Sequence, residues 1–374
     1  MAYSDIKDPS EHFQVKIYTA NNGYSVTVTN DGNSDLKPDL LWVKERTSPG
    51  GYEYDHNLFD SSRGVTKTLW SNSSAAEMTA SQSNYDLQSF NTDGFTTGSP
   101  ENTNSLGGAN ATDGKVAWQW KANGGTITTT PNGTQTTNNM QMATKHQVNS
   151  TAGFSICTYQ GATSYGSFYH GLGVKPDMII IKSRTNAYDW IVYHRDLTNT
   201  HTLYLNELSA GATNTAFFPA EPNTTQVYCK DHNSVFRPNG ADSYLAYCFA
   251  EIDGYSKFGS YIANQSRNGP FVYTGFKPAF IMIKNTAHAT NWEIFDHKRN
   301  PNNVANLKLG ANKNNAENGS DFGNSSQNNI DILSNGFKLL TGNTDTNVSG
   351  DVYVFVAFAE NPFVTSSGVP GTAR

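Results

Sequence analysis

Three copies of one short stretch constrain the fold of this chain more than any other feature of the sequence. Each copy begins with Lys-Pro and continues into an apolar run that ends at a lysine. The proline fixes its own φ angle and keeps the lysine before it out of the helical region. A short run rich in Ile, Val and Trp is typical of a buried strand. The copies lie at residues 37–46, 175–184 and 277–286.

Other features recur around these copies in a constant order. A strand with a tyrosine comes before each copy, an aromatic strand follows it, and an aromatic–alanine strand closes each repeat. The tyrosines are Tyr18, Tyr159 and Tyr261, the aromatic strands are residues 54–60, 188–194 and 291–296, and the closing strands are residues 116–122, 245–251 and 354–360. This order predicts one ancestral unit copied three times.

Strand-like runs of four to eight residues, separated by Gly, Asn or Pro, fill each repeat. We therefore expect an all-β fold of three tandem antiparallel β-sandwich or jelly-roll-like modules. The expected modules are residues 1–122, 152–252 and 253–374, the last with a C-terminal tail. Residues 123–151 are rich in Thr, Asn and Gly, and we expect them to form a linker.

The closing strands predict where the modules meet. In the first copy, Val116, Trp118 and Trp120 alternate with smaller or polar residues, which is the pattern of a strand half-exposed at an edge or an interface. The third copy is apolar on both faces. We expect it to be covered by another module or by another subunit.

Aromatic residues separate into two groups by their alignment between repeats. A position shared by several copies is better explained by core packing than by ligand binding, because only the fold is common to all copies. The residues expected in the core are Leu41, Trp42, Ile179, Ile180, Ile281, Met282, Trp190 and Trp292. Trp70 and Trp120 lack such alignment and are candidates for surface or ligand contact. His170, next to two glycines, is a third candidate, with a simple turn as the alternative.

Charge and cysteine content exclude several classes of partner and compartment. The formal net charge is −6 and no long basic cluster occurs, so we expect no nucleic-acid partner. No apolar stretch approaches 18 residues and no signal sequence is visible, so we expect no membrane association. The three cysteines, Cys157, Cys229 and Cys248, form no CxxC pair, and we expect them to be reduced and buried.

The sequence offers little for catalysis. Its nine histidines are scattered without the spacing of metal ligands, so we expect no metal and no cofactor. Paired carboxylates near aromatic strands, such as Asp55 with Asp60 or Asp189 with Asp196, could serve a glycosidase. They lie in turn-like contexts, however, and we expect no catalytic residues and no enzymatic activity.

Several segments resemble a family of proteins encoded by tailed phages, especially marine ones, that are described as tail-fibre or virion proteins. The segments are residues 8–13, 37–44, 58–64, 89–95, 170–176, 246–261 and 358–363, and the resemblance extends over nearly the whole chain. It implies a virion structural protein that is made in the cytoplasm of the host bacterium. Its expected partners are other virion proteins and further copies of itself, with a trimer as one form.

Two functions of such a virion protein compete. A short tail fibre or spike adhesin would bind a glycan or protein of the host surface through loops and exposed aromatics, in the last module or near Trp70. A capsid decoration protein, or another non-adhesive head or tail component, would instead pair its edge strands with neighbouring proteins. A glycan depolymerase is the third alternative.

Overall fold

The structure is a computed structural model that describes residues 6–21, 25–47, 53–80, 87–98, 114–133, 140–161, 165–236, 242–317 and 330–362. The expected C-terminal tail after residue 362 lies outside these residues. Within them the chain forms β-strands and one short 3₁₀ helix, η1 (Pro9–Glu11). The expectation of an all-β fold with antiparallel sheets is confirmed. Among the described strands, one pairing is parallel, that of β11 (Met140–Gln141) with β14 (Gly166–Tyr169).

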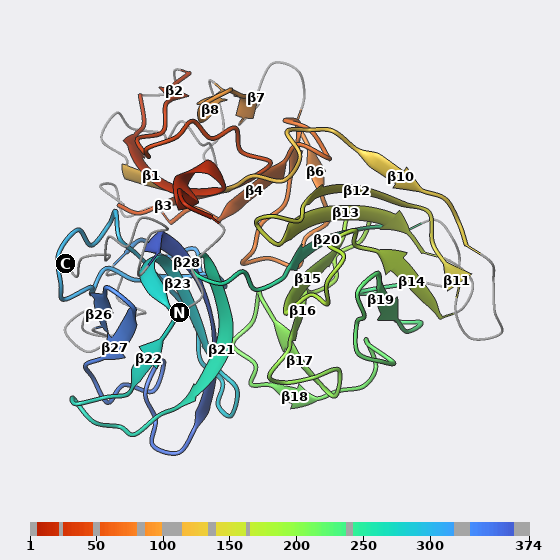
Figure 1. Cartoon of the computed structure of the whole chain (residues 1–374). Helices are drawn as coiled ribbons and strands as arrows, with labels where there is room; N and C mark the ends of the chain where they lie inside the picture. The colour runs from red at the N-terminus through yellow and green to blue at the C-terminus, as the bar shows by residue number, and fades with distance from the viewer. Residues whose placement is uncertain are drawn as a thin grey trace.

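Three large sheets share the same order of strands (Figure 1). In each sheet the strand with the recurring tyrosine pairs with the closing strand. The closing strand pairs on its other side with the Lys-Pro strand, which in turn pairs with the aromatic strand. The first sheet is β1 (Phe13–Thr19), β9 (Gly114–Trp120), β3 (Leu40–Glu45) and β4 (Asn57–Asp60). The second contains β13 (Phe154–Gln160), β20 (Ser243–Phe249), β15 (Met178–Ser183), β16 (Ile191–His194), β17 (His201–Tyr204) and β18 (Ala212–Thr213). The third is β21 (Ser256–Ile262), β28 (Val352–Pro362), β23 (Phe276–Asn285), β24 (Trp292–Asp296) and β25 (Leu309–Gly310).

A small sheet accompanies each large one, and we call each such pair a unit. Unit 1 holds β1 to β9, unit 2 holds β10 to β20, and unit 3 holds β21 to β28. The small sheets are β2 (Thr27–Val28), β8 (Phe95–Thr97) and β7 (Leu87–Phe90); β11, β14 and β19 (Gln226–Cys229); and β22 (Phe271–Tyr273), β27 (Gly336–Leu339) and β26 (Ile330–Leu333). A further pair, β5 (Lys67–Thr68) and β6 (Met78–Thr79), lies in unit 1.

Each unit is a two-layer sandwich with a core of its own. In unit 1, Leu41 and Val43 of the large sheet pack with Val28 and Phe95 of the small sheet. Corresponding clusters fill the sandwiches of units 2 and 3. Units 1 and 3 also share a Gly-Phe pair at the start of β8 and of β27. Glycine is needed there because a Cβ on Gly94 or Gly336 would collide with the carbonyl of the neighbouring strand.

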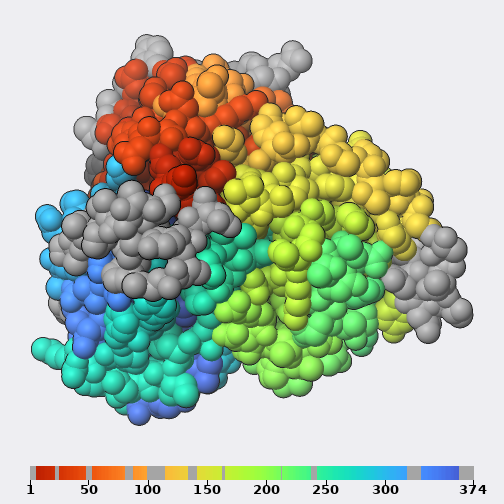
Figure 2. All heavy atoms as spheres, in the orientation of Figure 1, coloured from red at the N-terminus to blue at the C-terminus, as the bar shows by residue number. Residues whose placement is uncertain are grey.

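The other faces of the three large sheets pack against one another in a shared central core. Figure 1 shows the units arranged around this common centre, and Figure 2 shows unit 2 in contact with unit 1 and with unit 3 on the visible face. The closing strands place Trp120, Phe249 and Phe358 at equivalent positions, opposite the start of the Lys-Pro strand. These three rings form a triangle with centroid separations of 5.5, 5.9 and 6.3 Å. The units therefore surround an approximate threefold axis.

The Lys-Pro copies occupy equivalent positions, as the sequence predicts. They form β3, β15 and β23, which are buried throughout and lie between the closing and aromatic strands. Leu41, Ile179 and Ile281 point into the cores of their own sandwiches, whereas Trp42, Ile180 and Met282 point into the shared core. Trp190 and Trp292 are also buried in the shared core. All eight residues predicted for the core are thus buried.

Of the two predicted positions for the closing strand of unit 1, an edge or an interface, the structure shows the interface: β9 lies between β1 and β3, and its tryptophan face is buried in the core that the units share. One expectation needs correction. Residues 123–151 do not form a simple linker, because they contain β10 (Thr128–Thr130), β11 and β12 (Thr144–Asn149). β12 pairs with β13 along its whole length and extends the second large sheet. Threonine favours extended backbone, so a polar segment of this composition can pair as a strand.

Candidate functional site

The three units interlock in a cycle through equivalent backbone contacts. A loop residue of each unit donates its N–H to the carbonyl that follows the Lys-Pro strand of the next unit. The pairs are Glu77 to Arg184, Gly211 to Thr286 and Glu317 to Arg46, each at 2.9 Å. We call the three contacts the 1–2, 2–3 and 3–1 junctions, in that order.

Ring N–H groups repeat the same cycle. The indole nitrogen of Trp190 donates to the carbonyl of Trp70 at 2.8 Å, and that of Trp292 donates to the carbonyl of Tyr204 at 2.9 Å. In unit 1 the equivalent ring is His56, whose Nε2 lies 2.8 Å from the carbonyl of Gly310. Trp42 donates to Nδ1 of His56, so Nε2 carries the proton. Burial lowers the pKa of His56 well below its usual value, which keeps the ring neutral.

The lysine that ends the apolar run of each Lys-Pro copy is buried and donates hydrogen bonds to backbone carbonyls. Lys44 donates to the carbonyl of Asn314 at 2.9 Å, and Lys284 donates to that of Leu208 at 2.7 Å, in both cases across a junction. Lys182 donates to Ser183 of its own strand at 2.8 Å. Burial lowers the pKa of Lys44 to about 7 and those of Lys182 and Lys284 to about 8. The lysine is therefore part of the scaffold.

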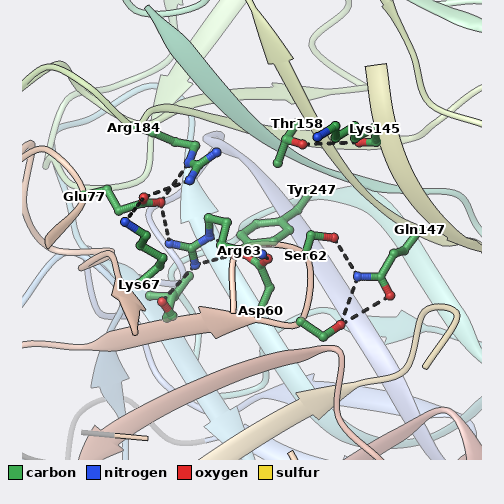
Figure 3. Close-up of polar contacts among 12 residues, drawn as sticks. Asp60, Ser62, Arg63, Lys67, Glu77, Lys145, Gln147, Thr158, Arg184 and Tyr247 are labelled. Atoms are coloured by element: carbon green, nitrogen blue, oxygen red, sulfur yellow. Dashed lines mark hydrogen bonds and ion pairs between the residues drawn. The ribbon is translucent and has the colours of Figure 1, made fainter. Parts of the chain in front are cut away.

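Buried ion pairs strengthen two of the three junctions. At the 1–2 junction Arg63 contacts Asp60 at 2.5 Å and Glu77 at 3.2 Å, while Arg184 binds Glu77 at 2.8 Å (Figure 3). The hydroxyl of Tyr247 donates to Asp60 at 2.9 Å. The 3–1 junction repeats this arrangement with Asp296, Arg299, Glu317, Arg46 and Trp118. Burial opposes ionisation of Glu77, but Arg184 and Arg63 outweigh it and lower the pKa of that carboxyl.

The 2–3 junction uses neutral groups at the same positions. His194 stands where units 1 and 3 have an aspartate, and its Nε2 contacts the carbonyl of Phe355 at 3.3 Å. The backbone N–H of Asp196 donates to Nδ1, so Nε2 carries the proton. Val356, the counterpart of Trp118 and Tyr247, has no donor for an aspartate. Burial lowers the pKa of His194 to about 4.

The candidates for surface contact lie elsewhere than expected. Trp120 is only 3% exposed and is part of the central triangle, so the prediction of a surface role is wrong. His170 is fully buried, and its ring contacts the carbonyl of Asn223 at 3.0 Å, which supports the turn interpretation. Burial lowers its pKa to about 4. Trp70 is half-buried and aligns with Tyr204, so it also belongs to the repeated scaffold.

Unit 3 instead exposes two aromatic rings that the sequence analysis missed. Phe271 and Tyr273 are 46% and 59% exposed and lie two residues apart on β22, so both point outward. Lys338 and Asp331 stand beside Phe271 on the same face of the small sheet, and Lys338 donates to Asn268 at 2.6 Å. We call these five residues the aromatic face. The sequence signal that could have identified this face is the alternation Phe-Val-Tyr at residues 271–273, which follows a polar turn.

Among the described strands, neither of the other units has this pair of exposed rings. In unit 2, Tyr169 stands at the position of Tyr273 but is half-buried. Val28 of β2 pairs with Phe95, and Val272 of β22 pairs with Phe337. The two valines therefore occupy equivalent, inward-pointing positions. Thr27 therefore corresponds to Phe271. In unit 2 the equivalent residue is Ser167, which is buried next to β11. Because the fold accepts Thr or Ser here, it does not require a ring at this position.

Metal and membrane signatures are not found in the described part of the chain. No three His, Cys, Asp or Glu side chains there lie close enough together to hold a metal ion. The three cysteines are buried free thiols. No helix among the described residues has the length and apolar character needed to cross a membrane.

The family described as a domain of unknown function (DUF7483) matches residues 8–362. No curated protein and no solved structure matches the chain.

Proposed function

The chain belongs to the DUF7483 family, and we propose that it is a virion structural protein that attaches the particle to the host cell surface. The family description assigns no activity. Support for the proposal comes from the resemblance to tailed-phage virion proteins and from the architecture. A scaffold built from a repeated unit, with a pair of exposed aromatic rings on the small sheet of unit 3, suits an adhesin better than an enzyme.

The observation that carries the adhesin proposal is the aromatic face. Two outward rings on one strand stand about 7 Å apart, since residues i and i+2 are separated by two strand rises. Such rings offer flat apolar surfaces to the C–H face of sugar rings, and burying them releases water. Lys338, Asp331 and Asn268 border Phe271 with groups that bind hydroxyls. The occupant we propose is therefore a glycan of the host surface.

A cell-binding assay tests this proposal. The labelled protein is expected to bind the bacterium that its phage infects, and Phe271→Ala with Tyr273→Ala is expected to weaken binding at least tenfold, or about 1.4 kcal/mol. Tyr165→Ala is the matched control, because Tyr165 is also an exposed aromatic (41%) but lies in unit 2. If the double variant binds as well as the wild type, the aromatic face is not the contact.

One observation favours a decoration or other non-adhesive structural role. β21 has a single neighbour in its sheet, and Ile262 at its end is 68% exposed, opposite Val352 at 38%. An apolar sheet edge of this kind can pair with a strand of a neighbouring protein. Immunogold labelling of intact particles distinguishes the two roles. Label on the tail tip together with cell binding supports the adhesin, whereas label over the head without cell binding supports decoration.

A further inference from the structure

A cleft of about 190 Å³ opens at the 3–1 junction, away from the residues of the aromatic face. One wall comes from the start of β1 and the loop that carries Asp31, and the other comes from β23, the turn after β24, and the end of β28. Phe13, Val15, Ala279 and Ala359 supply its apolar lining. This volume holds several water molecules, which is the scale of one small ring and not of a polymer.

Charged groups lie at the cleft in two clusters, of which Asp31, Glu360, His297 and Lys298 line it. Asp31 is held by Lys298 at 2.9 Å and by Lys16 at 3.2 Å. Glu360 is held by His297 at 2.8 Å and by Lys277 at 3.5 Å. Burial opposes ionisation of Asp31, but hydrogen bonds from Lys298 and Lys16 outweigh it and lower its pKa. Both carboxylates are thus fixed in position by cations.

The charge balance of these clusters is positive. Lys298 lines the cleft, and Lys16 and Lys277 stand behind its two carboxylates, so the net charge of the six groups is at least +1 even with His297 neutral. An ammonium group has three N–H donors. Lys298 uses one of them on Asp31 within the described residues, and its side chain is one-third exposed. The site can therefore bind an anion while its carboxylates accept hydrogen bonds from hydroxyl groups.

The equivalent positions at the 1–2 junction are closed. Ser61 and Ser62 stand there in place of His297 and Lys298, and the amide of Gln147 donates to both hydroxyls, at 3.0 and 2.6 Å (Figure 3). Gln147 belongs to β12, the additional strand of unit 2. The charged cleft is therefore not a requirement of the repeated fold.

The 2–3 junction carries a different set of charges. Arg195 occupies the position of His297 and binds Glu251 at 3.0 Å and Asp177 at 3.2 Å. Lys257 binds the same glutamate at 2.5 Å. The three junctions share their backbone contacts, and the side chains at this place differ in all three, as expected of a position free to acquire a ligand.

We propose that the 3–1 cleft binds a single acidic sugar residue. Its carboxylate would lie at Lys298, which lines the cleft, and its hydroxyls would donate to the carboxylates of Asp31 and Glu360. The carboxylates disfavour a purely anionic ligand such as phosphate, and the excess of lysines disfavours a neutral sugar. The proposal stands independently of the aromatic face, because the two sites share no residue.

Titration calorimetry of the full chain tests the proposal with sodium D-glucuronate as the probe. Glucuronate is expected to bind at least tenfold more tightly than D-glucose, which lacks the carboxylate, and than acetate, which lacks the hydroxyls. Lys298→Gln is expected to weaken glucuronate binding at least tenfold, and Lys298→Arg is expected to restore most of it. The matched control is Lys257→Gln, which removes the lysine of the 2–3 junction and leaves binding unchanged.

Three results would overturn the proposal: no heat of binding with glucuronate, equal binding of the three probes, or unchanged affinity in Lys298→Gln. The double variant of Phe271 and Tyr273 is expected to bind glucuronate normally. Loss of cell attachment in that variant and loss of glucuronate binding in Lys298→Gln are thus separate outcomes. Either site can fail its test without the other.

Discussion

The shared centre and the outer sheets follow opposite rules. At the centre, equivalent positions carry buried apolar or aromatic side chains in all three units, and Trp120, Phe249 and Phe358 meet around an approximate threefold axis. On the outer sheets, equivalent positions diverge, so that Phe271 in unit 3 corresponds to Thr27 in unit 1. The difference separates scaffold from recognition. Repetition marks residues that the fold needs, and departure from repetition marks residues that are available for function.

The largest expected effect comes from the central triangle. Trp120→Ala, Phe249→Ala and Phe358→Ala each remove a buried ring from the shared core, and each is expected to lower the free energy of unfolding by about 3–5 kcal/mol. Urea unfolding measures the three values. Similar losses at all three positions support an equivalent role, whereas a loss below about 1 kcal/mol at any of them would break the equivalence.

Next in size are the charged junctions. Glu77→Gln and Glu317→Gln each weaken ion pairs with two arginines, and each is expected to cost about 1.5–3 kcal/mol. Glu207→Gln is the control, since Glu207 is exposed and contacts Ser209 alone among the described residues. Unequal losses at Glu77 and Glu317 would show that the two charged junctions are not equivalent.

The neutral histidine at the 2–3 junction predicts a dependence of stability on pH. Burial lowers the folded-state pKa of His194 from 6.5 to about 4, so below pH 6.5 the unfolded chain binds a proton that the folded chain does not. Stability from this group is complete above pH 6.5 and falls as the pH drops towards 4, by at most about 1.4 kcal/mol per pH unit. His194→Gln is expected to flatten this part of the curve.

Unfolding curves between pH 4 and 7 measure the effect of His194. His288→Gln provides the comparison, because its side chain is 62% exposed and lies outside the junctions. An unchanged slope in His194→Gln would mean that this ring does not couple folding to protons.

The smallest expected effect on stability belongs to the aromatic face. Phe271→Ala and Tyr273→Ala remove outward rings and are each expected to change the free energy of unfolding by less than about 0.5 kcal/mol. The contrast with the central triangle is the point of the experiment. A cost above about 1.5 kcal/mol would show that these rings serve the scaffold, and any loss of cell binding would then have a structural cause.

The repeated strands were predictable from the sequence because their apolar runs must be buried wherever the units sit. The recurring lysine now has a reason, since Lys44 and Lys284 donate to carbonyls across the junctions. The roles of Trp120 and His170 were not predictable from one copy. A residue that lacks a matching letter in another repeat can still be core, as Trp120 is beside Phe249 and Phe358.

The packing of the three units around one shared core could not be predicted from the sequence either. The alternation in β9 fits a solvent-exposed face and a face buried by other units equally well. β12 was hidden by its polar composition, which suits both a linker and a strand. The aromatic face and the 3–1 cleft depend on comparing units in space. Only the register of β2 and β22 shows that Phe271 replaces Thr27.

Differential scanning calorimetry of the intact chain tests the central claim most directly. If the three units share one core, they must unfold together, and the calorimetric enthalpy should equal the van't Hoff enthalpy of a single transition. Two or three resolved transitions, each with its own enthalpy, would contradict the shared core and leave three independent domains.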